Sequence, residues 1–256
     1  MNILRQPRVY LVGRQQVDPE TVARFLADHQ SAWSTDTDIG AERLCEIAGR
    51  VCYMSFGSGR KSNADYLANI IDSAHGSVLE HAVWNFVITG VSRSFTHELV
   101  RHRAGFGYSQ LSQRYVDETT ADFVEPDCIA DEPELHAVWL ASIQQSHAAY
   151  CRLVEGLSRK FAAEPDKTLR RKLARQAARS VLPNATESKI FVTANGRALR
   201  HFIEARANEH AEVEIRRVAI TILRLLQNES PNIFGDYEIV ALADGSEVAR
   251  TTHRKV

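Results

Sequence analysis

The fifteen residues from Arg101 to Tyr115 have side chains suited to holding an anion. They include three arginines, one histidine, two glutamines, two serines and two tyrosines, and only Phe106 and Leu111 would suit a hydrophobic core. Clustered guanidiniums repel one another unless an anion lies between them, and each guanidinium matches phosphate or carboxylate with two parallel hydrogen bonds. Gly105 and Gly107 allow a sharp turn and close approach of a ligand. We therefore interpret the stretch as an anion-binding loop whose amides and hydroxyls can read a polar ring; the alternative is a solvated basic turn.

Two later segments carry similar groups. Lys172, Arg175 and Arg179 fall at i, i+3 and i+7 of a predicted helix and so form one stripe. A turn at 195–197 enters a further helix, on which Arg197 and His201 lie four residues apart. One basic stripe is usually a solvated face, but three basic segments, two of them following predicted strands, favour a shared pocket for phosphorylated ligands.

Several common sites are missing from the sequence. No GxGxxG follows a predicted strand, and no GxxxxGK[ST], HExxH or GxSxG occurs. An HxxEH motif also fails, because Ser77 stands where its first histidine should be. The sequence therefore predicts no Rossmann site, no P-loop, no catalytic triad and no metal centre.

The composition is that of an ordinary globular protein. Of 256 residues, 44% are hydrophobic and 25% charged, and the formal net charge is −1. No overall positive charge recruits nucleic acid or a membrane surface, and no apolar run approaches the roughly 20 residues of a membrane span. The N-terminus lacks a signal-peptide pattern, and the four cysteines lack CxxC spacing. We expect a reduced, cytoplasmic protein without membrane or nucleic-acid partners.

Hydrophobic periodicity predicts a helix-rich α+β fold with a small sheet. The length allows one large domain or a core with a smaller helical appendage. Because no interdomain linker is evident, we expect residues 1–256 to form one domain with a helical subregion at about 131–182. Asp18 and Pro19 predict a helix start. The predicted helix from Gly40 to about Met54 is expected to bury Leu44, Ile47, Ala48 and Val51, with Cys45 and Cys52 on one buried face. Predicted strands cover 9–12, 82–91, 189–193 and 233–242, and predicted helices cover 18–32, 40–54, 92–103, 131–163, 166–182 and 213–226. Residues 55–62 are expected to form a loop that could close over a site.

The order of the residues in the basic segments is more specific than their composition. Arg101-His-Arg103 followed by Ser112-Gln-Arg-Tyr115 resembles the signature of the flavin-dependent thymidylate synthases. Other segments resemble the same family in the same order: 75–81, 96–103, 175–187 and 206–216. One departure is that eight residues, not the usual seven, separate Arg103 from Ser112. The extra residue lies within 104–107, where two glycines could absorb it as a bulge.

The resemblance implies a mostly antiparallel sheet surrounded by helices and a homotetramer with sites shared between protomers. It implies reductive methylation of dUMP to dTMP, with methylenetetrahydrofolate as carbon donor and FAD, reduced by NADPH, as hydride carrier. By position in the motifs, FAD would be held by Ser77, Arg101, His102, Arg103, Gln110, Asn195, Gly196, Arg197 and His201. dUMP would be surrounded by Glu98, Arg101, Gln110, Leu111, Ser112, Gln113, Arg114, Lys172, Arg179 and Arg206.

The residue types agree with these implied roles. Arg114 and Arg179 suit a phosphate, and Ser112 adds neutral donors. In the family Arg206 favours ionisation at N3 of the uracil, where its guanidinium stabilises negative charge as it develops. A cysteine nucleophile is the mechanistic alternative, but Cys128 lies in an acidic loop and the others in apolar patterns. An alternative of another class is a non-catalytic oligomeric protein that binds nucleotides or RNA in the same basic pocket.

Overall fold

A computed structural model describes residues 1–57, 59 and 62–256 of the chain. The described residues group into two compact units, each built from separate stretches of sequence. Unit 1 contains residues 1–8, 88–99 and 109–190, and unit 2 contains residues 9–87, 100–108 and 191–256. In the part of the chain described, no helix has both the length and the apolar character that a bilayer span requires.

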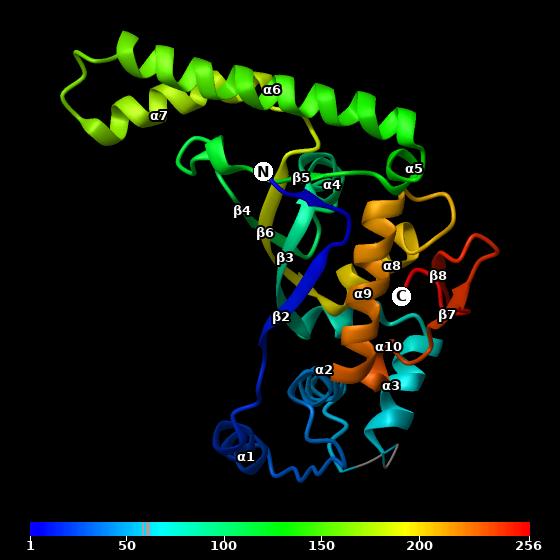
Figure 1. The fold of residues 1–256 in the computed structure, drawn as a ribbon. Coiled ribbons are helices and arrows are strands. Elements are labelled where there is room, and N and C mark those ends of the chain that lie inside the picture. Colours follow the sequence, from blue (N-terminus) through cyan, green and yellow to red (C-terminus); the bar gives the residue numbers. More distant parts are fainter. Residues whose placement is uncertain (58, 60–61) are drawn as a thin grey trace. The chain divides into compact units, whose positions relative to one another are not determined.

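The largest sheet has four strands in the order β2 (Arg8–Arg14), β3 (Val83–Ser92), β6 (Glu187–Asn195) and β4 (Phe106–Gln110) (Figure 1). Alternate residues of β3, Trp84, Phe86 and Ile88, are fully buried, as expected of a strand with one face on a core. Two small sheets pair β1 (Ile3–Leu4) in parallel with β5 (Phe123–Val124), and β7 (Glu238–Ala241) antiparallel to β8 (Glu247–Arg250). The predicted mixture of helices with small sheets is confirmed.

Unit 1 holds α4 (Arg93–Leu99), the short helices η2 (Glu118–Thr120) and α5 (Asp127–Ala130), and the long helix α6 (Pro133–Lys160). The helix α7 (Lys167–Ala178) runs beside α6 and continues into the 3₁₀ turn η3 (Arg179–Val181) (Figure 1). Ile143 and Tyr150 bury one face of α6. Leu135 and Val138 of the same helix are 51% and 67% exposed, so they do not pack within the described part of this chain.

Unit 2 holds α1 (Pro19–Asp28), α2 (Gly40–Val51), α3 (Asn63–Asp72) and the 3₁₀ helix η1 (Gly76–His81). It also holds α8 (Gly196–Arg206), α9 (Val213–Glu229) and α10 (Pro231–Phe234). The predicted start of α1 is confirmed, because the Asp18 carboxylate accepts a hydrogen bond from the Thr21 amide at 3.0 Å. Leu199, Phe202, Ile215 and Leu223 give α8 and α9 fully buried faces.

The predicted buried face of α2 is confirmed at Cys45 and wrong elsewhere. The buried residues are Ala41, Glu42, Cys45, Glu46, Gly49 and Arg50, whereas Val51 is 44% exposed and Cys52, beyond the helix end, is also exposed. Polar partners explain the reversal: the Glu46 carboxylate accepts hydrogen bonds from Trp33 Nε1, Asn63 Nδ2 and Arg50 Nε, at 2.8 to 2.9 Å. A satisfied charged network can occupy an interior that hydrophobic periodicity assigns to apolar residues.

Three other boundaries differ from the predictions. Residues 106–110, read as part of a loop, form β4, because they pair with β6. The helix predicted to reach Arg103 ends at Leu99, and the predicted strand at 233–242 begins as α10 after Pro231 and becomes β7 only at Glu238. Of the loop predicted at 55–62, Ser58, Arg60 and Lys61 lie outside the described residues.

Candidate functional site

Three segments of unit 2 that carry predicted FAD residues meet at the start of α8. The Gly196 amide donates to the Ala82 carbonyl at 2.8 Å, directly after η1, and the Asn195 amide donates to the Gly105 carbonyl at 3.1 Å. The Asn195 side chain caps α8 by accepting from the Ala198 amide at 2.8 Å. A helix N-terminus of this kind favours phosphate and other anions.

Charged groups surround this helix start. Arg197 Nη1 lies 2.7 Å from Glu80 Oε1 of η1, and both side chains are about half exposed. Arg101, Arg103 and Ser77 are exposed, so their side chains are accessible to a ligand. The structure thus gathers Ser77, Asn195, Gly196 and Arg197 around one helix end, with the turn after Arg103 alongside.

The turn at 103–106 depends on a glycine. Gly105 has φ of +73°, and a Cβ there would lie 2.7 Å from both Ala198 Cβ and Asn195 Nδ2. The Phe106 amide closes the turn by donating to the Arg103 carbonyl at 3.1 Å. Because a side chain at this position would meet α8, only glycine brings this backbone so close to the helix start.

His102 and Arg206 form a direct contact in the same unit. Arg206 Nε donates to His102 Nε2 at 3.0 Å, and the His102 ring packs edge-on against Phe202 with centroids 5.1 Å apart. The ring of His201 lies 6.1 Å from that of His102. Burial, with the charges of Arg206 and His201, lowers the pKa of His102 to about 4, so its imidazole is neutral at pH 7.

The remaining predicted residues lie in unit 1. Gln110 Nε2 donates to Thr96 Oγ1 at 2.8 Å and to Ser188 Oγ at 3.1 Å. Since both amide hydrogens are used, Gln110 can offer a ligand only its carbonyl oxygen. Glu98 on α4 is half-buried. The residues that follow β4 form a turn in which Leu111 donates its amide to the Lys189 carbonyl at 2.8 Å, and Gln113 is buried.

Arginines of unit 1 are gathered beyond this turn. Arg114 Nε is buried and has no hydrogen-bond partner among the residues that the structure describes, which makes it a donor suited to an anion. Lys172 Nζ lies over the Tyr115 ring, 5.3 Å from its centroid. Arg175 follows Lys172 on the predicted stripe but is bonded within the protein: it donates to the Tyr115 carbonyl at 2.6 Å and to the Asp117 carboxylate at 2.7 Å.

Arg93 is a residue that sequence reasoning missed. It begins α4 and is half-buried, and burial together with the positive charge of Arg179 lowers its pKa, while Glu118 opposes that shift. Its Nη1 donates weakly to the Leu111 carbonyl at 3.4 Å. Two mutually repelling guanidiniums are typical of a phosphate site. The sequence signal for Arg93 was its place directly after a predicted strand, because two of the three predicted basic segments also follow predicted strands.

Glu118, whose charge acts on Arg93, is 4% exposed. Burial raises its pKa to about 7, while the charge of Arg93 lowers it and that of Glu187 raises it. Within the described part of the chain, its Oε1 has no hydrogen-bond partner. The basic cluster of unit 1 thus includes one carboxylate whose charge depends on pH near neutrality.

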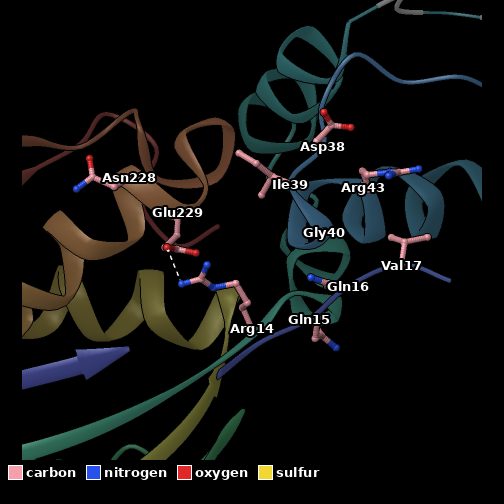
Figure 2. A pocket seen from close by; sticks show the side chains of 10 residues that line it. All are labelled: Arg14, Gln15, Gln16, Val17, Asp38, Ile39, Gly40, Arg43, Asn228 and Glu229. Carbon is pink, nitrogen blue, oxygen red and sulfur yellow. Dashed lines mark ion pairs between the residues drawn. The ribbon is translucent and has the colours of Figure 1, made fainter. Parts of the chain in front are cut away.

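None of the predicted residues lines the cavity shown in Figure 2, which has a volume of about 480 Å³. Its walls come from the end of β2, the start of α2 and the end of α9. Arg14 and Glu229 form an ion pair of 3.1 Å there, and the lining also contains one further residue of each charge, Asp38 and Arg43. Because the charges cancel, this cavity does not share the anion-binding character of the predicted site.

Comparison with known proteins agrees with these groups. The sequence profile of the thymidylate synthase complementing protein family matches residues 35–232. A flavin-dependent thymidylate synthase of Mycolicibacterium gilvum is 57% identical over 228 residues, covering 88% of this chain and 90% of the relative. Proteins of the same name from Mycobacterium avium and Mycobacterium tuberculosis are 55% and 53% identical over the same shares.

The fold also matches a solved structure. The UMP/dUMP methylase PolB from Streptomyces cacaoi, bound with 5-Br dUMP, superposes with a TM-score of 0.65 and 18% identity. The superposition covers 92% of this chain and 96% of that one. With the profile match over most of the chain and relatives above 50% identity, the chain belongs to the family of flavin-dependent thymidylate synthases.

Proposed function

We propose that the chain converts dUMP, methylenetetrahydrofolate, NADPH and a proton into dTMP, tetrahydrofolate and NADP⁺, with FAD as its bound cofactor. The observation that carries this proposal is that the chain, which belongs to this family, contains two basic clusters. One lies at the start of α8 in unit 2, and the other consists of Arg93, Arg114 and Arg179 in unit 1. Each cluster offers guanidinium donors of the kind that bind phosphate. PolB, of similar fold, is a UMP/dUMP methylase by name.

The residues of unit 2 fit FAD by the chemistry of their donors. Arg197 would place its guanidinium at a phosphate beside the α8 start, whose backbone is held by the amides of Asn195 and Gly196 and by the close approach that Gly105 permits. The flavin-binding set implied by the family motifs also includes Ser77, Arg101, His102, Arg103, Gln110 and His201. When bound, FAD reduced by NADPH supplies the hydride that turns the transferred carbon unit into a methyl group.

For dUMP we propose a phosphate subsite made of Arg93, Arg114 and Arg179, with Ser112 as neutral donor. Arg93 adds to the residues expected from the sequence. The buried, unpartnered Nε of Arg114 and the lowered pKa of Arg93 support it, because both are relieved by a dianion. Glu98, Arg101, Gln110, Leu111, Gln113, Lys172 and Arg206 would surround the rest of the nucleotide.

Arg206 would act on the pyrimidine. A guanidinium beside the ring stabilises negative charge as N3 gives up its proton, so that C5 becomes nucleophilic enough to take up the carbon unit without a covalent bond to the protein. The cysteines support this reading. Cys45 is fully buried and burial raises its pKa to about 12, so it is a neutral thiol at pH 7.

The proposal is tested by assaying dTMP formation with the holoenzyme and its variants. Cys52→Ala and Cys128→Ala should retain turnover, whereas Arg206→Ala should lose most of it while FAD stays bound. A cysteine variant that folds and binds FAD but forms no dTMP would refute the mechanism without a cysteine nucleophile. A bound-flavin absorption spectrum of the purified protein that bleaches on anaerobic addition of NADPH tests the cofactor separately.

We further propose that the chain is one catalytic domain of a cytoplasmic homotetramer in which protomers share sites, as the family resemblance implies. The competing idea, a non-catalytic nucleotide- or RNA-binding protein, has the net charge of −1 against it. A colourless protein that binds RNA with steep salt dependence would favour that idea.

A further inference from the structure

The hydrogen bond between Arg206 and His102 sets the state of both side chains. An arginine Nε always carries its hydrogen, so at 3.0 Å His102 Nε2 must be the acceptor. The imidazole is therefore neutral and carries its hydrogen on Nδ1. An imidazolium would present a second donor to the guanidinium and break the bond.

The ring that accepts this bond is held by its surroundings. Phe202 packs edge-on against it at 5.1 Å and Phe106 lies 6.0 Å away. Tyr108 Oη donates to the His102 carbonyl at 2.6 Å, and burial raises the pKa of that tyrosine, which keeps the hydroxyl protonated. The position of Nε2 is thus fixed by packing and by the backbone, as a positioning group requires.

The guanidinium is fixed through the nitrogen nearest its stem. The contact with His102 uses Nε, so it does not itself use the two terminal nitrogens of Arg206. A planar guanidinium anchored at Nε has its plane and reach defined. Donors held where charge develops stabilise a transition state better than donors that must reorganise.

We propose that His102 is a positioning residue for Arg206: its neutral Nε2 holds the guanidinium in the orientation in which the terminal nitrogens meet the pyrimidine of dUMP. This role is additional to the flavin contact that the family motif implies for His102. The inference rests on the proposed function, since it assigns Arg206 to the pyrimidine.

A double-mutant cycle on the holoenzyme tests the pairing. His102→Gln keeps an acceptor the same number of bonds from Cα as Nε2, whereas His102→Leu removes it. We expect His102→Leu to lower kcat at saturating dUMP, and to weaken dUMP binding measured by calorimetry, by about tenfold to hundredfold, the range for a hydrogen bond to a charged group. His102→Gln should restore most of both, and His29→Gln, at an exposed histidine of unit 2, should change neither.

The decisive result is the coupling. In an Arg206→Ala background, His102→Leu should produce no further loss of dUMP affinity, because its effect passes through the arginine. An equal loss in both backgrounds, or a His102→Gln variant as impaired as His102→Leu, would overturn the inference. FAD content is measured for every variant, so that a flavin-binding role of His102 is seen separately. Failure of the wild-type enzyme to form dTMP would instead refute the proposed function.

Discussion

Replacing Arg93 tests whether the structure has revealed a phosphate ligand that the sequence did not. Arg93→Met keeps the length and apolar stem of the side chain and removes its charge. The protein contact that is lost, 3.4 Å from the Leu111 carbonyl, is long and therefore weak. The main effect should thus fall on a bound phosphate. A hydrogen bond between charged groups contributes about 1.5–3 kcal/mol, so dUMP affinity should fall about tenfold to hundredfold.

The assay compares dUMP with deoxyuridine, which lacks the phosphate, by calorimetric titration of the holoenzyme. Arg93→Met should weaken dUMP binding and leave deoxyuridine binding nearly unchanged. Arg175→Met is the matched control, because Arg175 is bonded to Asp117 and the Tyr115 carbonyl and is not assigned to the nucleotide. FAD content should not change, because Arg93 is not among the residues assigned to FAD.

One side effect of the substitution is predictable. The charge of Arg93 lowers the pKa of the buried Glu118 carboxyl, so its removal leaves that carboxylate less stable. A variant that also carries Glu118→Gln removes this complication and should still bind dUMP weakly. Unchanged dUMP affinity in both variants, or an equal loss for dUMP and deoxyuridine, would refute the phosphate assignment.

Three further outcomes follow from the structure. Because the pKa of Glu118 is raised from 4.5 to about 7, the folded state binds more protons than the unfolded state between these values. The free energy of unfolding therefore falls as pH rises through that window. Urea unfolding at pH 5 and pH 8 should show a difference of about 2–3 kcal/mol in the wild type, and Glu118→Gln should remove it. Arg200, fully buried, donates two hydrogen bonds to Asp236 at 2.6 and 2.8 Å, so Asp236→Asn should cost about 3–5 kcal/mol of unfolding free energy, and a loss under 1 kcal/mol would contradict this. Gly105→Ala should lower FAD occupancy by disturbing the α8 start, with a backbone cost of about 1–2 kcal/mol, whereas Gly107→Ala, whose Cβ would meet nothing closer than 3.8 Å, should retain FAD.

Much of the chemistry could be read from the sequence because it resides in short, contiguous motifs. The clustered arginines of 101–114, the glycines beside them and the segments in family order pointed to a phosphorylated ligand and to the family. Local signals also fixed several elements: Asp18 with Pro19 began α1, and Asn195 with Gly196 began α8. These signals act within one turn of the chain, so no distant residue is needed to read them.

The remaining features depend on residues far apart in the sequence. The polar face of α2 is buried because Trp33 and Asn63 donate hydrogen bonds to the Glu46 carboxylate. The hydrophobic periodicity of residues 40–51 contains no information about those partners. Residues 106–110 became a strand because β6, some eighty residues later, pairs with them. Likewise, the sequence identified His102 and Arg206 as site residues but did not predict the hydrogen bond between them. Arg93 became a candidate phosphate ligand only once the structure showed that the charge of Arg179 acts on it. Residue types and local order determine which chemistry is available, whereas tertiary packing decides which groups share a partner and which charges are buried.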